Sequence, residues 1–306
     1  MRKISMRSLV LVFGFVLVSF VWGLPSQAAD APPSDGKTLL AQYTRIEPKM
    51  SASQFGIPIN LVSSEEGNTS RAEIYSVLDY PFERVRDAIM LPSSWCDISL
   101  LHINVKACTF KQAKDAWLLT MYTGRKYYQA PEDAHELTYV FKTVAAKPDY
   151  LSLLLTAEDG PLSTKDYRIV LQAVPLGADK TLLHLSYRFS YGFFGRVAMK
   201  TYFGTIGSGK IGFSVVGTDD AGKPEYVGGT KGAIERNVVR YFYAIQTHVE
   251  MAKYPADQRF EKSIERWYEL TDRHKKQLFE LKREEYVSNK RKEYQNQLML
   301  QKKLDG

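Results

Sequence analysis

The chain has 306 residues, of which 44% are hydrophobic and 25% are charged, so it can bury a sizeable core in one or two domains. Its formal net charge is +7, but the excess comes from three bases among the first seven residues and from residues 253–306, which hold 14 basic and 10 acidic residues. Residues 30–252 are neutral, which argues against a nucleic-acid-binding face, because such a face concentrates positive charge on the folded domain.

The N-terminus has the layout of a secretory signal peptide. A basic start precedes an apolar run of thirteen residues, 9–21, and small residues follow it. We expect cleavage after Ala28 or Ala29 and export of the mature chain, which would make it periplasmic or secreted. An uncleaved membrane anchor is the alternative, although the apolar run is short for a membrane span of about 20 residues.

The chain has two cysteines, Cys96 and Cys108. In an exported protein such a pair predicts a disulfide. Two free thiols or half of a metal site are the alternatives. A structural zinc site needs four ligands, and only His102 lies between the cysteines.

The first elements are expected to alternate between helices and strands. Residues 30–36 form a polar linker, and residues 37–66 include a short helix at 38–45 and a strand at 55–62 that Pro58 interrupts. Residues 71–78 alternate in polarity and predict a strand.

Two helices and a further strand are expected next. Pro81 suits the first turn of a helix, because its missing N–H is not needed there. A second short helix, capped by Ser93 or Ser94, precedes residues 101–110, which alternate strictly and predict a strand.

A series of strands follows without an intervening helix, which predicts an antiparallel meander. Alternating runs bounded by turns occupy residues 116–125, 137–144, 150–158, 166–174 and 181–191. Residues 192–217 are ambiguous, with a possible helix at 196–203 and a strand or helix at 211–216.

Residues 231–252 predict a long amphipathic helix with Thr230 as its N-cap and Pro255 beyond its end. Its apolar stripe consists of Ile234, Val238, Tyr241, Ile245 and Val249. Its other side is expected to hold Glu235, Arg236, Arg240, Tyr243, Gln246 and Glu250. In the tail, apolar residues spaced four and three apart from Phe260 to Leu281 predict one long docked helix, with fraying from Arg291 onward.

The layout, and above all the segment AEIYSVLDYPFERVRDAI at 72–89, resembles the START-related, Bet v 1-like superfamily (SRPBCC proteins), which has the helix-grip fold. The resemblance covers residues 71–252. It implies an α+β fold, with a curved antiparallel sheet wrapped around a long C-terminal helix and a hydrophobic cavity between them. It implies binding of sterols, phospholipids or other apolar small molecules, and some members act as aromatic cyclases. Residues 192–229 and the charged helical tail depart from the family pattern.

The domains expected are therefore a signal peptide (1–29), a linker and extension (30–70), a START-like ligand-binding domain (71–254) and a charged helical tail (255–306). Strand aromatics offer an apolar wall with hydroxyl groups, and arginines could hold a carboxylate or phosphate head group. The expected ligand-binding residues are Trp95, His102, Tyr122, Arg125, Tyr139, Arg168, Tyr187, Arg188, Tyr191 and Tyr241. The alternative for most of the tyrosines is packing in the core or on the outer face of the sheet.

The sequence contains no complete catalytic motif. Residues 204–210 fit GxxxxGK, but Ile211 follows where a phosphate loop needs Ser or Thr. There is no His-x-His or His-Glu-x-x-His metal pattern and no G-x-S-x-G elbow, so we predict no catalytic residue, no metal and no cofactor.

Three hypotheses follow, in order of preference. The first is an exported binding or transport protein for a hydrophobic or amphiphilic molecule, such as a lipid, a sterol-like or a polyketide-like compound. The second is an interaction protein whose tail docks on an envelope protein or an anionic membrane surface. The third is an acid–base enzyme, a cyclase or hydrolase, that uses the same cavity.

Overall fold

The computed structural model describes residues 35–51, 53–192, 195, 201, 205 and 209–306. The predicted signal peptide lies outside these residues, as does most of the candidate helix at 196–203. The described residues belong to one structural unit, Pro32–Gly306.

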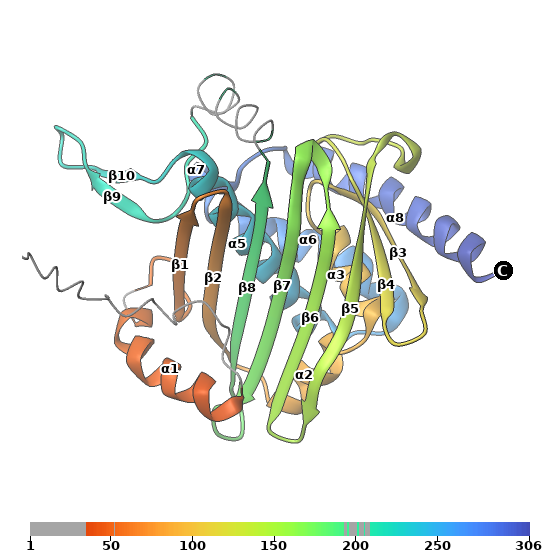
Figure 1. The fold of residues 1–306 in the computed structure, drawn as a ribbon, viewed down its shortest axis with the longest axis horizontal. Coiled ribbons are helices and arrows are strands. Elements are labelled where there is room, and N and C mark those ends of the chain that lie inside the picture. Colours follow the sequence, from red (N-terminus) through yellow and green to blue (C-terminus); the bar gives the residue numbers. More distant parts are fainter. Residues whose placement is uncertain (1–34, 52, 193–194, 196–200, 202–204, 206–208) are drawn as a thin grey trace, which may run out of the picture. The chain divides into compact units, whose positions relative to one another are not determined.

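The centre of the fold is a curved, eight-stranded antiparallel sheet (Figure 1). Its strands are β1 (Ile59–Glu66), β2 (Thr69–Leu78), β3 (Val105–Gln112), β4 (Trp117–Thr123), β5 (His135–Lys147), β6 (Tyr150–Asp159), β7 (Thr164–Pro175) and β8 (Thr181–Tyr191). Their order across the sheet is β1-β2-β8-β7-β6-β5-β4-β3. The predicted meander from β4 to β8 is confirmed, and a separate hairpin consists of β9 (Val215–Thr218) and β10 (Pro224–Tyr226).

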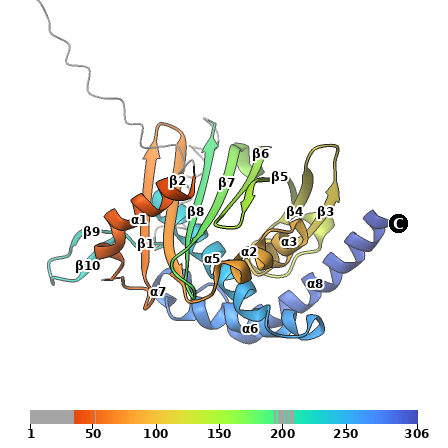
Figure 2. The same cartoon turned by 90° about the horizontal axis from the view of Figure 1, so that it is seen from below.

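The helices are α1 (Gly36–Met50), α2 (Phe82–Ile89), α3 (Pro92–Leu100), α5 (Gly229–Met251), α6 (Ala256–Asp272), α7 (Lys275–Leu278) and α8 (Arg283–Asp305). The sheet curves around α2, α3 and α5 (Figure 2). No helix among the described residues combines the length and the hydropathy that crossing a bilayer requires.

Strict alternation in β2 gives the sheet two buried faces. Ala72 and Ile74 point into the main core under α5, whereas Tyr75 and Val77 point to the opposite face. There they meet α1, whose Leu39 is fully buried in a second, smaller core. The helix predicted at 38–45 is therefore longer than expected, because its apolar residues have a sheet face to cover.

Most of the polar side predicted for α5 is buried, which differs from the amphipathic helix expected, and only Gln246 and Glu250 of that side are partly exposed. Glu235, Arg236, Arg240 and Tyr243 expose 0%, 6%, 3% and 1% of their surface. The buried charged side chains bind backbone groups of other segments. Arg240 donates to the Leu278 carbonyl, and the Glu235 carboxylate accepts hydrogen bonds from the Phe213 and Ser214 amides at 2.6 and 2.9 Å. These partners come from segments that sequence periodicity cannot place beside a helix.

The start of α5 also differs from the prediction. The N-cap is Gly228 rather than Thr230, and the helix begins at Gly229, which has a positive φ of 61°. A Cβ atom on Gly232 would lie 2.7 Å from the Val227 carbonyl oxygen. Glycine is needed there because the preceding chain folds back against the first turn.

Two predicted elements around the cysteines are corrected. Pro92 is the first residue of α3, so the helix needs no serine cap, and the strand predicted at 101–110 begins only at Val105. Residues 101–104 form a turn, in which the His102 amide donates to the Ser99 carbonyl. The predicted disulfide is confirmed: Cys96 on α3 is bonded to Cys108 on β3.

The tail is three helices rather than one long helix. α6 ends at Asp272, α7 spans a single turn, and α8 remains helical to Asp305 instead of fraying from Arg291. Ile264, Trp267 and Tyr286 belong to the same hydrophobic core as α5. The apolar spacing from Phe260 to Leu281 predicted which residues are buried, but it ran across the ends of α6 and α7, which it could not reveal.

Helix α8 lies along the free edge of β3. The Cys108 amide donates to Gln297 Oε1 at 2.9 Å, and Lys290 Nζ donates to the Val105 carbonyl at 2.9 Å. Side chains of a helix thus satisfy backbone groups that would otherwise be left open at a sheet edge.

Candidate ligand-binding cavity

A cavity of about 660 Å³ lies between the sheet and one face of α5. Its walls come from β4, β5, β7, β8, α5, the turn before β3 and the loop between β4 and β5. The lining residues are His102, Asn104, Val105, Met121, Thr123, Gly124, Arg125, Gln129, Asp133, His135, Leu137, Tyr139, Pro161, Thr164, Tyr167, Tyr187, Phe189, Ala233, Asn237 and Tyr241.

On α5 the cavity is bordered by a narrow stripe, Ala233, Asn237 and Tyr241, spaced four residues apart so that they share a face. The neighbouring residues Ile234 and Val238 are fully buried in the core. The cavity therefore lies beside the N-terminal half of the apolar stripe, and side chains fill the space beneath the rest.

Because side chains alternate between the two faces of each strand, the inward-facing aromatic residues form a continuous wall of the cavity. Tyr187 and Phe189 on β8 and Tyr167 on β7 point inward, and the Tyr167 ring stacks on Phe189 with centroids 5.5 Å apart. The ring centroids of Tyr187 and of Tyr241 on α5 are 6.0 Å apart, and those of Tyr139 and Tyr167 are 6.2 Å apart in an edge-to-face arrangement. Such rings supply large apolar contact while presenting hydroxyl groups.

His102 presents an unsatisfied polar atom at this wall. Its side chain is 4% exposed and its ring stacks on Tyr241 at 4.9 Å. The Asn104 amide donates to Nδ1 at 3.2 Å, so the neutral ring carries its proton on Nε2. Nε2 forms no well-aligned hydrogen bond with a described residue, although the Asn237 side chain, which also lines the cavity, is close enough to interact with the ring. Burial lowers the pKa of His102 well below its usual value; the charges of Arg240 and Lys290 act in the same direction, and the nearby Asn237 side chain opposes them. Nε2–H is therefore a neutral, buried donor.

Three tyrosine hydroxyls join this donor. Tyr139, Tyr187 and Tyr241 form no hydrogen bond with another described residue. Burial raises the pKa of each phenol, so the hydroxyls keep their protons. Four neutral donors therefore face the cavity without a well-aligned partner among the described residues.

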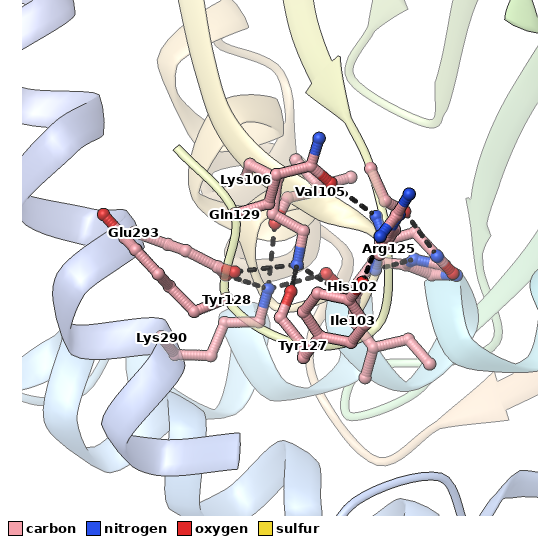
Figure 3. A network of polar contacts seen from close by, with 12 residues as sticks. His102, Ile103, Val105, Lys106, Arg125, Tyr127, Tyr128, Gln129, Lys290 and Glu293 are labelled. Atoms are coloured by element: carbon pink, nitrogen blue, oxygen red, sulfur yellow. Dashed lines mark hydrogen bonds and ion pairs between the residues drawn. The ribbon is translucent and has the colours of Figure 1, made fainter. Parts of the chain in front are cut away.

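The loop at the rim is tied to the turn that carries His102. Asn104 Nδ2 donates to the Gly124 carbonyl at 2.8 Å, and the Arg125 amide donates to Gln129 Oε1 at 3.0 Å. Lys106 Nζ donates to the Tyr127 carbonyl at 3.0 Å (Figure 3). The rim is therefore an ordered part of the site.

Behind the turn lies a buried ion network, which Figure 3 shows. Glu293 on α8 pairs with Lys106 at 2.8 Å and with Lys290 at 2.7 Å, and Lys290 also donates to the His102 carbonyl at 2.7 Å. Burial lowers the pKa of Lys290 to about 8. The position of His102 thus depends on a contact from α8, far along the chain.

The structure brings together five of the residues expected to bind a ligand: His102, Arg125, Tyr139, Tyr187 and Tyr241 line the cavity. The other five lie elsewhere. Trp95 on α3 is buried in the core, where its indole N–H donates to the Ile89 carbonyl, and Tyr191 is the last residue of β8, with its hydroxyl bonded to Glu65. Tyr122, Arg168 and Arg188 alternate with inward-facing residues and point to the opposite face of the sheet.

Several lining residues are not among the ten expected to bind a ligand. Tyr167 and Phe189 share the inward alternation of Tyr187, so face assignment along β7 and β8 would have found them. Ala233 and Asn237 precede Tyr241 at helical spacing, and a small residue beside a polar one gives no sequence signal for a cavity wall.

A second hollow, of about 590 Å³, lies between α2, α3, α6 and the end of α5. Burial raises the pKa of Asp97 to about 6 and lowers the pKa of His248 to about 4. Within the described ranges, no cluster of three or more His, Cys, Asp or Glu residues could hold a metal ion.

No protein-family model matches the chain, and no curated protein matches it. Similar solved structures include human StAR-related lipid transfer protein 5, with 13% identity and a TM-score of 0.35, over 71% of this chain and 99% of that chain. The Zhui aromatase/cyclase from a Streptomyces species has 12% identity and a TM-score of 0.35, over 62% and 95%. A protein from Thermus thermophilus has 12% identity and a TM-score of 0.38, over 61% and 99%.

Similarities this weak carry no statement about function. The architecture itself, a curved antiparallel sheet around a long helix with further helices beyond it, is the one expected from residues 71–252. The described part of the chain has the helix-grip fold that its sequence resemblance to the START-related, Bet v 1-like superfamily predicts.

Proposed function

We propose that this protein is an exported carrier that holds a hydrophobic or amphiphilic small molecule in the cavity beside α5. The observation that carries the proposal is the cavity of about 660 Å³ with an aromatic wall and unpaired donors. Ligand sites are typically concave, mostly apolar and equipped with a few polar groups. The export part of the proposal rests on the layout of the first 29 residues alone.

The four donors indicate the chemistry of the ligand's inner end. His102 Nε2–H and the hydroxyls of Tyr139, Tyr187 and Tyr241 are neutral, and each can donate a hydrogen bond. A carbonyl, ether or hydroxyl oxygen would satisfy them, whereas an ammonium group is itself only a donor and offers no lone pair to accept their protons. The ligand we infer is therefore apolar along its body and has uncharged oxygen acceptors at one end.

The same groups argue against acid–base catalysis. His102 Nδ1 already accepts the Asn104 amide and Nε2 holds the ring proton, so neither nitrogen is available as a base. The enclosed tyrosines keep their protons because burial raises their pKa. Donors of this kind can hold an oxygen atom in place without removing a proton from the ligand.

Binding can be tested with Nile red, a neutral dye with an apolar ring system and a carbonyl acceptor, added to the full mature chain. We expect saturable fluorescence enhancement in the wild type and its loss in Ala233→Trp, which fills the cavity from α5. Ala178→Trp, in an exposed turn, is the matched control. Binding by Ala233→Trp equal to that of the control would overturn the proposal.

The role of the donors is tested separately. Tyr187→Phe removes one hydroxyl without changing the wall, and we expect about fivefold weaker dye binding, because one hydrogen bond contributes about 1 kcal/mol. Tyr122→Phe, on the opposite face, should leave the affinity unchanged. Organic extraction of purified protein followed by mass spectrometry then identifies the natural ligand, and a compound without oxygen acceptors would contradict the inferred polar end.

A further inference from the structure

Three arginines form a row across the outer face of the sheet, away from the cavity. Arg71 on β2 is directly opposite Arg188 on β8, and Arg188 is directly opposite Arg168 on β7. The inward neighbours Ala72, Tyr187 and Ile169 belong to the main core, which places the arginines on the other face. Directly opposed side chains have Cβ atoms about 5 Å apart, so the three arginine side chains stem from one patch of the sheet.

Helix α1 leaves this patch uncovered. It packs on Tyr75, Val77 and Leu182, which lie nearer the other end of the same strands. Arg188 is exposed and Arg168 is half-buried. The patch is therefore open to a ligand although it forms part of an ordered sheet.

The charge of the row is only partly compensated. Glu73 pairs with Arg71 and lies 3.7 Å from His184 Nε2. Arg168 and Arg188 form no hydrogen bond or ion pair with another described residue. Burial, followed by the charges of Arg188 and Arg71, lowers the pKa of Arg168. Like charges directly opposite each other destabilise a sheet. The row therefore lowers the stability of the fold, and packing gives no reason for three arginines at these positions.

We propose that the Arg71–Arg188–Arg168 row is an anion-binding site that takes a multivalent phosphate, as in a phosphate monoester or a pyrophosphate group. Planar guanidinium groups match phosphoryl oxygens with paired hydrogen bonds. Two arginines without a partner supply the charge that a dianion needs, and the anion removes the repulsion between them. Hydroxyls border the row, where Thr69 Oγ1 and Ser190 Oγ lie 2.9 Å apart. The site is independent of the cavity and of the carrier proposal.

Inorganic pyrophosphate is the probe for this site, measured by isothermal titration calorimetry on the full mature chain at constant ionic strength. We expect saturable binding by the wild type and about tenfold weaker binding by Arg188→Gln, which loses the central guanidinium. Arg45→Gln, on an exposed position of α1, makes the same change of charge and should bind as the wild type does.

Two further measurements separate this site from general effects. Without the anion, Arg188→Gln should be at least as stable as the wild type at low salt, because it relieves repulsion, so a folding defect cannot explain weak binding. Ala233→Trp should bind pyrophosphate normally, because the cavity lies on the other face. Equal affinity of Arg188→Gln and Arg45→Gln, or no saturable binding by the wild type, would overturn the proposal.

Discussion

The side-chain amide of Gln301 forms two hydrogen bonds with the backbone of Phe110. The Phe110 amide donates to Gln301 Oε1 at 2.9 Å, and Gln301 Nε2 donates to the Phe110 carbonyl at 3.0 Å. One residue of α8 thus reproduces the pair of bonds that a ninth strand would make with the edge of β3. Gln297 repeats half of this arrangement two residues earlier on the strand, at Cys108.

Replacing Gln301 should therefore destabilise the edge of the sheet. Gln301→Ala leaves two part-buried backbone groups of Phe110 without partners, and we expect a loss of about 2 kcal/mol in the free energy of unfolding. Urea denaturation followed by circular dichroism measures the loss. Gln295→Ala, on an exposed face of the same helix, is the control. Equal stability of the two variants would show that the paired bonds contribute nothing.

The buried ion network makes a second prediction. Glu293 pairs with both Lys106 and Lys290, and it is the one carboxylate to do so in the described part of the chain. Both partners of the Lys106–Glu293 pair have fully buried side chains. Glu293→Gln leaves two buried cations without a counter-charge, so we expect a loss of about 3–5 kcal/mol.

A double variant separates charge from packing. Lys106→Met combined with Glu293→Gln leaves one buried cation instead of two, so it should be more stable than Glu293→Gln alone. Thermal unfolding of the two variants in one buffer tests this. A double variant that is less stable than the single variant would mean that the hydrogen bonds of Lys106 to the Ile103 and Tyr127 carbonyls outweigh its charge.

The sequence was sufficient for strands β4 to β8 because their signal is local, whereas β1 and β3 begin about four residues further along the chain than predicted. Alternation and turn residues fixed β4 to β8 within a few residues, and helical periodicity found α5. Alternation also separates two of the expected ligand-binding residues: Tyr187 and Arg188 are neighbours on β8, so they cannot both face one cavity. The inward residue is Tyr187, because Leu183 and Leu185 on its face are in the main core.

The contacts of α8 were not predictable in the same way. The residues that bond to β3 are Lys290, Glu293, Gln297 and Gln301, and Tyr286, one turn earlier on α8, donates to the Leu101 carbonyl just before the strand. They repeat at helical spacing, but they are mostly polar, and a polar stripe is normally the solvated side of a helix. Only the edge strand, brought near by tertiary folding, gives the stripe its partners. The unpaired Nε2 of His102 depends on the same tertiary contacts, so no local pattern could mark it as a donor.

The disulfide offers a third prediction. Cys96 and Cys108 join α3 to β3 across twelve residues of sequence separation. The Cys96→Ala/Cys108→Ala variant should lose about 3 kcal/mol, because its unfolded state regains the freedom that the closed loop removed. A reductant should lower the melting temperature of the wild type and leave that of the double variant unchanged. A wild type insensitive to reductant after full reduction, confirmed by thiol titration, would contradict this.

The last prediction concerns acid. His102 and His248 are kept neutral in the folded state because burial lowers their pKa, which for His248 is about 4 against an ordinary value of 6.5. Between pH 6.5 and about pH 4 the unfolded chain binds more protons at His248 than the folded protein does. The stability that this histidine contributes above pH 6.5 is therefore lost as the pH falls through this range to the folded pKa.

For His248 alone the loss amounts to roughly 3 kcal/mol at most, since each unit of pKa shift corresponds to about 1.4 kcal/mol. His248→Gln does not titrate, so the difference in unfolding free energy between the wild type and this variant should shrink or reverse from pH 7 to pH 4. Asp97 titrates with the opposite sign, because burial raises its pKa to about 6, and it is present in both proteins and therefore largely cancels in the difference. Urea denaturation at half-unit steps of pH measures the curve. A difference that stays constant across the range would mean that His248 is protonated as easily in the folded protein as in the unfolded chain.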